Sequence, residues 1–237
     1  MIKITENLPL VQLMSFEFLR GLCDTETSVK FQFWEFDMSR QAIIHRTTYF
    51  LLLMVILTLL AAIITYLINP DMSHVINATS NVTPSSVAHA KGWSLVGTYF
   101  LHNGVQIPLV MLVLSLIPIG YLYLWNPILT AILPGILYGI ALRHSVRAGL
   151  AILIGSLPHS LLEYTEMCVL AAFLFEINRI IRLKWHHWRK RTETTQPLMP
   201  VCRPLLKGYL IAVVPLCLAA AICETFVADI IANWING

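Results

Sequence analysis

His159, Glu163 and Glu166 are ionisable residues that lie inside a long apolar stretch, residues 149–177. Successive residues of an α-helix are rotated by ~100° about its axis, so the residues four and seven positions after His159 fall on nearly the same helix face. An imidazole and a carboxylate at this spacing can reach one metal ion or one substrate atom. The spacing therefore predicts a shared polar site on one face of a helix.

Three further polar residues lie in other apolar stretches: His102, Asn103 and Glu224. One interpretation is a zinc site, because Zn²⁺ accepts nitrogen and oxygen ligands in a tetrahedral arrangement. Its ligands would be His102, His159, Glu163 and Glu224. Alternatively, Glu163 and His159 activate a water molecule, and Asn103 stabilises an oxyanion. Glu166 would support either arrangement from the next helical turn.

The same residues also allow an interpretation without chemistry. A hydrogen-bonded pair of His159 and Glu163 would hold two transmembrane helices together, a contribution of about 0.6 kcal/mol on average. A charged side chain at the bilayer centre costs about 2.5–3.5 kcal/mol on insertion scales, so such residues normally face the interior of a helix bundle. A catalytic site, an ion or proton path and a structural contact therefore remain three open hypotheses.

The stretches that carry these residues are apolar enough to cross a bilayer. Of the 237 residues, 57% are hydrophobic and only 12% are charged, whereas a soluble domain has about a quarter charged residues. The apolar residues form runs near the ~20 residues that a transmembrane helix needs. The chain is therefore predicted to be an integral membrane protein. Its small net charge of +3 argues against nucleic-acid binding.

The positions of the apolar runs predict an all-α transmembrane helix bundle of about five to six spans. The transmembrane domain is predicted over residues 47–231, with spans at about 47–68, 99–124, 128–142, 149–177 and 206–231. Pro134 and Pro158 predict Pro-interrupted or re-entrant helices in the third and fourth spans. Gly135 and Gly139 form a GxxxG pair that permits close helix contact, either within the chain or between copies.

The distribution of Lys and Arg predicts the orientation. Residues 1–46 are predicted to form an amphipathic segment in the cytosol or at the membrane interface. The loop 69–98 holds a single Lys, whereas the loop 178–205 is strongly basic. Basic loops remain in the cytoplasm, so the N-terminus and loop 178–205 are predicted to be cytoplasmic and loop 69–98 extracytoplasmic. Arg143 and Arg147 fit this orientation only if both interrupted segments are re-entrant.

Four segments, in this order along the chain, resemble one known family. They are Asn103 early in the second span, residues 133–139 (LPGILYG, similar to an NGxxxG segment), residues 157–163 (LPHSLLE, similar to an LPHGxxE signature) and residues 220–224 (AAICE, similar to AAxxE). The chain thereby resembles the stage II sporulation protein M family of bacterial and archaeal membrane proteins over about residues 99–230. Ser160 and Pro134 depart from the family, which usually has Gly and Asn there.

The resemblance implies an all-helical protein of the cell membrane that works with partners. The family's namesake belongs to a membrane complex for cell-wall remodelling during engulfment, and other members are encoded with ABC transporters or with circular-bacteriocin genes. We therefore expect a component of a cell-envelope or peptide maturation and export machine. Its partners would be membrane lipid, other membrane proteins and a hydrophobic peptide.

Two other functions stay open at this point. One is an intramembrane metal-dependent peptidase or peptide cyclase that acts on a hydrophobic precursor. The other is an ion- or proton-coupled transporter, which interrupted helices and acidic residues within the membrane would suit.

Overall fold

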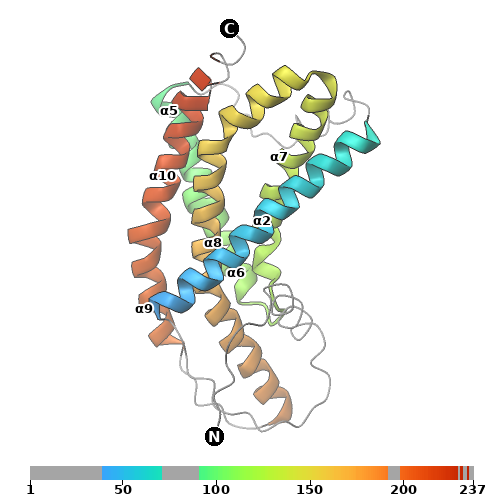
Figure 1. The fold of residues 1–237 in the computed structure, drawn as a ribbon. Coiled ribbons are helices and arrows are strands. Elements are labelled where there is room, and N and C mark those ends of the chain that lie inside the picture. Colours follow the sequence, from blue (N-terminus) through green and yellow to red (C-terminus); the bar gives the residue numbers. More distant parts are fainter. Residues whose placement is uncertain (1–38, 71–90, 192–197, 229, 232–233, 235–237) are drawn as a thin grey trace, which may run out of the picture. The chain divides into compact units, whose positions relative to one another are not determined.

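Five long helical rods make up the part of the chain that the computed structural model describes, residues 39–70, 91–191, 198–228, 230, 231 and 234 (Figure 1). The rods are α2 (Arg40–Ile68); α5 (Trp93–Leu101) with η1 (His102–Gln106) and α6 (Ile107–Ser115); η2 (Leu122–Leu124) with α7 (Trp125–His144); α8 (Val146–Lys190); and α9 (Met199–Gly208) with η3 (Tyr209–Val213), α10 (Val214–Ile222) and η4 (Cys223–Val227). The described residues contain no strand, which confirms the predicted all-α bundle. Most of the predicted N-terminal segment and parts of both predicted loops lie outside the described residues.

Four of the rods are long and apolar enough to cross a membrane: α2, α5 to α6, η2 to α7, and α9 to η4. Little of the apolar part of α2 is buried inside the protein, and Leu59, Ile63 and Leu67 are exposed on its surface. Large outward-facing apolar surfaces suit contact with lipid. The chain is therefore a multi-pass membrane protein.

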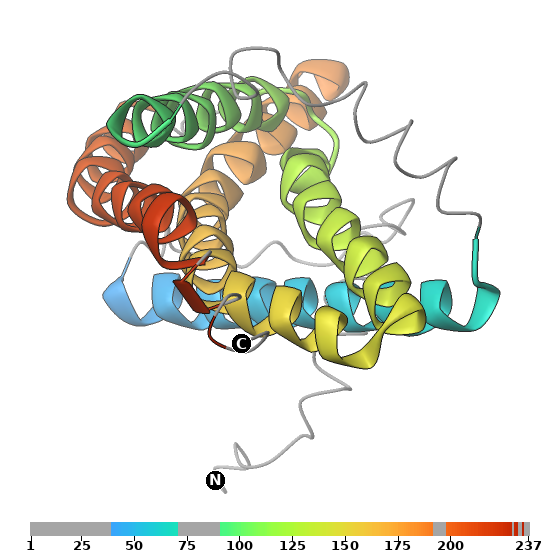
Figure 2. The same cartoon turned by 90° about the horizontal axis from the view of Figure 1, so that it is seen from above.

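The remaining rod, α8, contacts all the others. It packs against α2, α6, α7, α9 and α10, and it runs between them in the view of Figure 2. Four of the buried polar side chains of the described residues belong to it: Ser160, Glu166, Glu176 and Asn178. A bilayer offers no hydrogen-bond partners, so the helix that carries polar groups must be covered by protein. The position of α8 follows from its composition.

One end of α2 contacts the C-terminal half of α8, and the other end contacts the end of α7, directly before α8 begins. Near the start of α2, Arg46 Nη2 lies 2.6 Å from Oε1 of Glu176, late in α8. Near the end of α2, the Tyr66 ring centroid lies 5.4 Å from the Arg143 guanidinium, just before α8 begins. These contacts make α2 and α8 antiparallel, and consecutive rods run in opposite directions (Figure 1).

Pro134 and Pro158 lie inside continuous helices, α7 and α8. The interruptions predicted at these residues therefore take another form: the helix continues through each proline. A proline removes one backbone hydrogen bond and its ring crowds the preceding turn, which bends a helix without ending it when neighbours support the backbone. The first part of α8 is inclined to the remainder (Figure 2). There Ser156 Oγ lies 2.6 Å from the Tyr138 hydroxyl and joins α8 to α7.

The helix of the second rod ends at Ser115, earlier than the limit of 124 predicted from hydropathy. Pro118 and Gly120 follow, and Tyr121 adopts a left-handed φ of 62°. Three carbonyl groups of this turn, of residues 115, 117 and 119, accept hydrogen bonds from Asn178 Nδ2 at 3.0, 2.9 and 3.2 Å. Asn178 thus supplies the donors that a helix end inside an apolar bundle needs.

Gly135 and Gly139 place α7 directly against α2. A Cβ atom added to Gly139 would lie 2.5 Å from the Ala62 carbonyl oxygen and 2.8 Å from Thr65 Cβ, and one at Gly135 would collide with the Thr58 carbonyl. The predicted close contact at this GxxxG pair is confirmed, and it lies within the chain. Thr58 reinforces it, because its hydroxyl donates to the Ala131 carbonyl on α7 at 2.9 Å.

Replacing Gly139 with Ala should destabilise the bundle. The added methyl group would overlap backbone atoms of α2, and overpacking of this kind costs about 1–3 kcal/mol. Gly97→Ala is the matched control, since a Cβ there meets nothing within 4 Å and alanine favours the helix by about 1 kcal/mol. Thermal unfolding of the purified protein in mild detergent would show Gly139→Ala below, and Gly97→Ala at or above, the wild-type midpoint. Equal midpoints for both variants would contradict the close contact.

Asn178→Ala should lower the free energy of unfolding by about 1–3 kcal/mol, because it leaves the carbonyl groups of residues 115 and 119 without this donor, whereas that of residue 117 keeps the backbone N–H of Ile119 at 2.8 Å. Asn178→Asp should lower it further, since a carboxylate would face the same oxygens. Asn126→Ala removes a half-exposed amide for which the described residues provide no hydrogen bond, and it should change little. Unfolding of the three variants in the same detergent checks this order.

Candidate functional site

One hydrogen bond connects two residues that the sequence analysis singled out on different rods. Asn103 Nδ2 donates to Glu163 Oε1 at 2.9 Å, which joins η1 to α8. Both side chains are partly buried. This hydrogen bond gives the side-chain amide of one helix and the carboxyl group of the other a polar partner. Neither lipid nor apolar side chains could provide one.

A second carboxyl group approaches Glu163 from the last rod. Glu224, on η4, lies within electrostatic range of Glu163, and it forms a side-chain hydrogen bond with Tyr99 of α5. The site thus draws residues from three rods: the one with α5 and η1, the one with α10 and η4, and α8 between them.

Glu166 extends the site by one turn along α8. Its side chain is only 1% exposed, and it forms a side-chain hydrogen bond with Cys217 of α10. The Cys217 thiol also lies 3.9 Å from the Phe100 carbonyl oxygen. One carboxyl oxygen of Glu166, Oε2, has no hydrogen-bond partner among the described residues. Glu166 is therefore an acidic group held in place on one side and unsatisfied on the other.

The rod with α5 and η1 packs closely against the rod with α10 and η4, and this packing depends on Gly104 and Tyr209. A Cβ atom at Gly104 would lie 2.9 Å from Cys217 Sγ, so a larger residue would force the thiol or the helix to shift. The Tyr209 hydroxyl of η3 donates a short hydrogen bond to the Gly104 carbonyl. These contacts fix the position of Asn103, the neighbour of Gly104 in η1.

The backbone around the site is π-helical in three places. The segment η1 carries Asn103, η4 carries Glu224, and η3 carries Tyr209. Single π-helical turns inside α-helices are rare and are frequent at functional sites, because the wider turn redirects side chains and loosens backbone hydrogen bonds. Both of the rods that supply partners to Glu163 are widened at the residue that makes the contact.

The structure brings together four of the predicted site residues: Asn103, Glu163, Glu166 and Glu224. His102 is not among them, because its Nδ1 lies 2.9 Å from Gln106 Oε1 on the exposed side of η1. His159 lies on α8 as predicted, but its buried Nδ1 has no hydrogen-bond partner among the described residues. The predicted pair of His159 and Glu163 is replaced by the pair of Asn103 and Glu163.

The predicted zinc ligands do not form a metal site in this arrangement. Across the described residues, no three His, Cys, Asp or Glu side chains are placed to hold a metal ion. The chemistry of the gathered groups is that of carboxyl, amide, thiol and phenol side chains. The described part of the chain gives none of the three carboxyl groups a Lys or Arg partner, since its ion pairs involve only Glu176. Three charges there would be costly, at about 2.5–3.5 kcal/mol each on insertion scales.

Sequence reasoning missed Tyr99, Tyr209 and Cys217 as members of this site. Cysteine and tyrosine inside an apolar run look like packing residues, so no local signal marks them. Sequence reasoning also missed Glu176, which lies on α8 outside this site. The cost of a charge in an apolar stretch applies to Glu176 as it does to Glu163, and this cost alone would have identified it as a buried polar residue.

The comparison with known protein families matches this part of the chain. Residues 47–229 match the family described as Stage II sporulation protein M, a range that runs from α2 past η4 and contains the whole site. No curated protein and no solved structure matches the chain. Of the segments on which the resemblance rests, residue 103 and residues 157–163 and 220–224 meet at the site, and residues 133–139 form the contact of α7 with α2. The chain belongs to the stage II sporulation protein M family.

Proposed function

We propose that the chain is a component of a cell-envelope or peptide maturation and export complex, and that this work depends on the intramembrane site at Glu163. The observation that supports the proposal is the hydrogen bond between Asn103 and Glu163, which joins two rods inside the apolar bundle. Membership of the stage II sporulation protein M family gives this site its setting, and the proposed work with partners follows from what the resemblance to that family implies.

The surface of the described residues supports a role through contacts within the bilayer. Long apolar side chains are exposed along α2, α6 and α10, for example Ile63, Leu109 and Leu218. Such surfaces suit lipid, neighbouring transmembrane helices and a hydrophobic peptide. The proposed partners are accordingly membrane lipid, another membrane protein such as an ABC transporter or envelope component, and a hydrophobic peptide of the bacteriocin type.

One observation favours a second candidate function, an ion- or proton-coupled transporter. Glu163, Glu166 and Glu224 come together from two rods within apolar helices, and acidic groups placed in this way are typical of proton and ion paths. Uptake or release driven by a pH gradient in vesicles that contain the pure protein would support it. The metal-dependent peptidase or cyclase has less support, because no three of the proposed donors are placed around one point in the described residues.

The position of basic residues supports a cytoplasmic N-terminus. Arg40 and Arg46 lie at the end of α2 that contacts the basic C-terminal part of α8, where Lys184, Arg189 and Lys190 follow. At the other end of the bundle, the described residues carry fewer basic side chains: Lys91, Arg143 and Arg147. The excess of basic residues favours the first end as the cytoplasmic one.

Glu163→Gln is expected to leave the protein folded and to abolish its function. The glutamine carbonyl can accept the same hydrogen bond from Asn103, so the unfolding free energy should stay within about 1 kcal/mol of the wild type. The measurement is the amount of mature exported peptide in the medium of the host strain, together with protein level and thermal stability in detergent. Unchanged export would show that the carboxyl group has a structural role only.

A matched pair of variants on η1 tests how much the contact between Asn103 and Glu163 stabilises the bundle, as measured by thermal unfolding in detergent. Asn103→Ala leaves Glu163 unpaired and should cost about 1–3 kcal/mol of stability. Gln106→Ala removes an amide from the exposed side of the same segment and should change stability by no more than about 0.5 kcal/mol. If deletion of the whole chain left both peptide export and envelope integrity intact, the proposed function itself would be wrong.

The proposed orientation makes a separate prediction for fusion proteins. Alkaline phosphatase, which is active only outside the cytoplasm, should be active when it is joined after Gly237 and inactive when it is joined after Arg191. A green fluorescent protein fused at the same two positions should show the opposite pattern. The reverse result for both reporters would place the N-terminus outside.

A further inference from the structure

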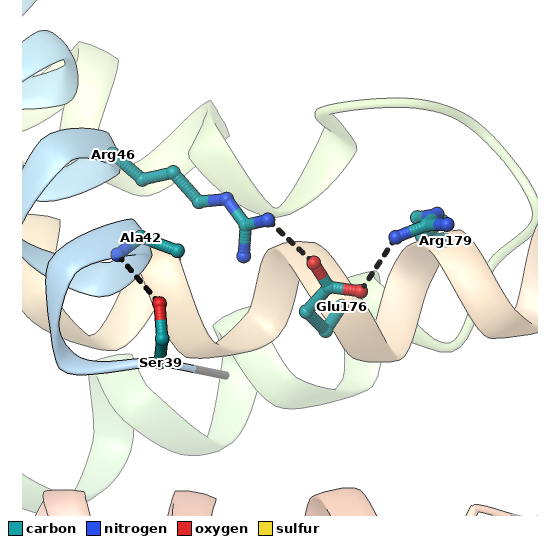
Figure 3. Close-up of polar contacts among 5 residues, drawn as sticks. All are labelled: Ser39, Ala42, Arg46, Glu176 and Arg179. Carbon is teal, nitrogen blue, oxygen red and sulfur yellow. Dashed lines mark hydrogen bonds and ion pairs between the residues drawn. The ribbon is translucent and has the colours of Figure 1, made fainter. Parts of the chain in front are cut away.

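A second polar cluster lies away from the candidate site, where the start of α2 meets the C-terminal half of α8 (Figure 3). Glu176 is at its centre and is only 1% exposed. Its two carboxyl oxygens are shared by two guanidinium groups, Arg46 at 2.6 Å and Arg179 at 3.1 Å. The Arg46 guanidinium also lies 4.5 Å from the ring centroid of Phe175. Each carboxyl oxygen of Glu176 is thus paired with one arginine.

Arg182, one turn after Arg179 on α8, is placed differently. Its side chain is half-buried, and its Nε atom is buried without a hydrogen-bond partner. No carboxyl group of the described residues lies within ion-pair distance of it. A guanidinium group that is partly removed from water, and for which the described part of the chain provides no anion, is energetically unfavourable without a further partner.

Tyr123 of η2 supplies a second unsatisfied donor at the same place. Its side chain is 0% exposed and its hydroxyl group has no hydrogen-bond partner among the described residues. It lies within electrostatic range of Arg182, Arg46 and Glu176. A buried donor without a partner costs about 1–3 kcal/mol. The cluster therefore combines a positive group with donors that only an additional acceptor would satisfy.

A phosphate group fits these donors. It offers several acceptor oxygens and a negative charge, and arginine binds such groups through two parallel N–H donors. A carboxylate would also be attracted, but the position of the cluster favours a phosphate that comes from the membrane itself.

The residues that follow the cluster on α8 are of the kinds that lie at the level of the lipid headgroups. Trp185 and Trp188 follow Arg182 by one to two turns on α8 and are 47% and 69% exposed, and exposed tryptophans of membrane proteins lie at the interface. The strongly basic end of α8 comes directly afterwards. Basic pockets between transmembrane helices at this depth bind anionic headgroups.

We propose that Arg182 and Tyr123, together with the arginines held by Glu176, bind the headgroup phosphate of an anionic phospholipid between α2, η2 and α8. The acyl chains of the lipid would lie along the exposed apolar surface of α2 or α6. The site takes lipids with a net negative charge in preference to zwitterionic lipids, whose own ammonium group would meet the cluster of guanidinium groups.

The test uses the purified full-length protein in a neutral detergent, titrated with phosphatidylglycerol or with phosphatidylcholine. Phosphatidylglycerol should raise the unfolding temperature, and phosphatidylcholine should have little effect. Arg182→Gln should shift the midpoint of the phosphatidylglycerol titration to about fivefold higher lipid, the effect of one basic residue near a membrane surface. Arg189→Gln removes a charge of the same helix that is exposed to water and therefore screened by salt, so it should shift the midpoint less than about twofold.

A second variant keeps the proposal testable if Arg182→Gln does not fold. Tyr123→Phe removes only a hydroxyl group that the described residues leave unsatisfied, so the variant should fold, and its response to phosphatidylglycerol should weaken. An unchanged response of Tyr123→Phe, or equal shifts for Arg182→Gln and Arg189→Gln, would overturn the site. Sodium phosphate at the same phosphate concentration distinguishes the two sources: stabilisation equal to that by the lipid would assign the site to a soluble phosphate compound instead.

Discussion

The whole arrangement depends on the low polarity of the bilayer, which cannot satisfy a hydrogen-bonding group. The long helix α8 carries carboxyl and amide side chains along much of its length, so it is stable only when other helices surround it. The remaining rods are apolar on their outer surfaces and contribute single polar groups inward. Asn103 and Asn178 show two ways in which buried polar groups find partners. Asn103 donates a hydrogen bond to a carboxyl group of another rod, and Asn178 donates to the backbone carbonyl groups at the end of a helix.

Much of the fold could be predicted from the sequence because the membrane makes hydropathy so informative. The runs of apolar residues marked the helical rods, and the GxxxG pair of Gly135 and Gly139 marked a contact that the structure confirms within the chain. Helix ends were harder to predict. Apolar residues continue after Ser115, and it is Pro118 together with the distant Asn178 that ends the helix there. Hydropathy cannot register a hydrogen bond to a residue more than sixty positions away.

The candidate site could be predicted in part and for a physical reason. Glu163, Glu166 and Glu224 are costly in an apolar run, and this cost marks them regardless of the fold. Their partners are different. Asn103 was selected, but Tyr99, Tyr209 and Cys217 are ordinary residues of apolar helices and become polar partners only through packing. His102 and His159 show the opposite case, since their side-chain type suggested metal binding whereas their positions direct them elsewhere.

The prolines of α7 and α8 show how neighbouring helices change the effect of a residue. In an isolated helix, Pro134 or Pro158 would favour a break. In the bundle, the flanking turns are held by contacts such as that between Tyr138 and Ser156, and the helix bends instead. The bend gives α8 two segments with different directions, which lets one helix pack against α7 near its start and against α10 further along.

The π-helical turn η1 has a consequence for the register of its rod. A π-turn holds one more residue than an α-turn, and each residue of an α-helix corresponds to a rotation of about 100°. If the same residues formed ordinary α-turns, everything after η1 would be rotated by about that angle relative to α5. The apolar stripe of α6 would then face another neighbour, and the carbonyl of Ser115 would point away from Asn178. The wide turn η1 thus determines which side of the second half of the rod faces α8, although the backbone conformation of a turn changes neither hydropathy nor charge.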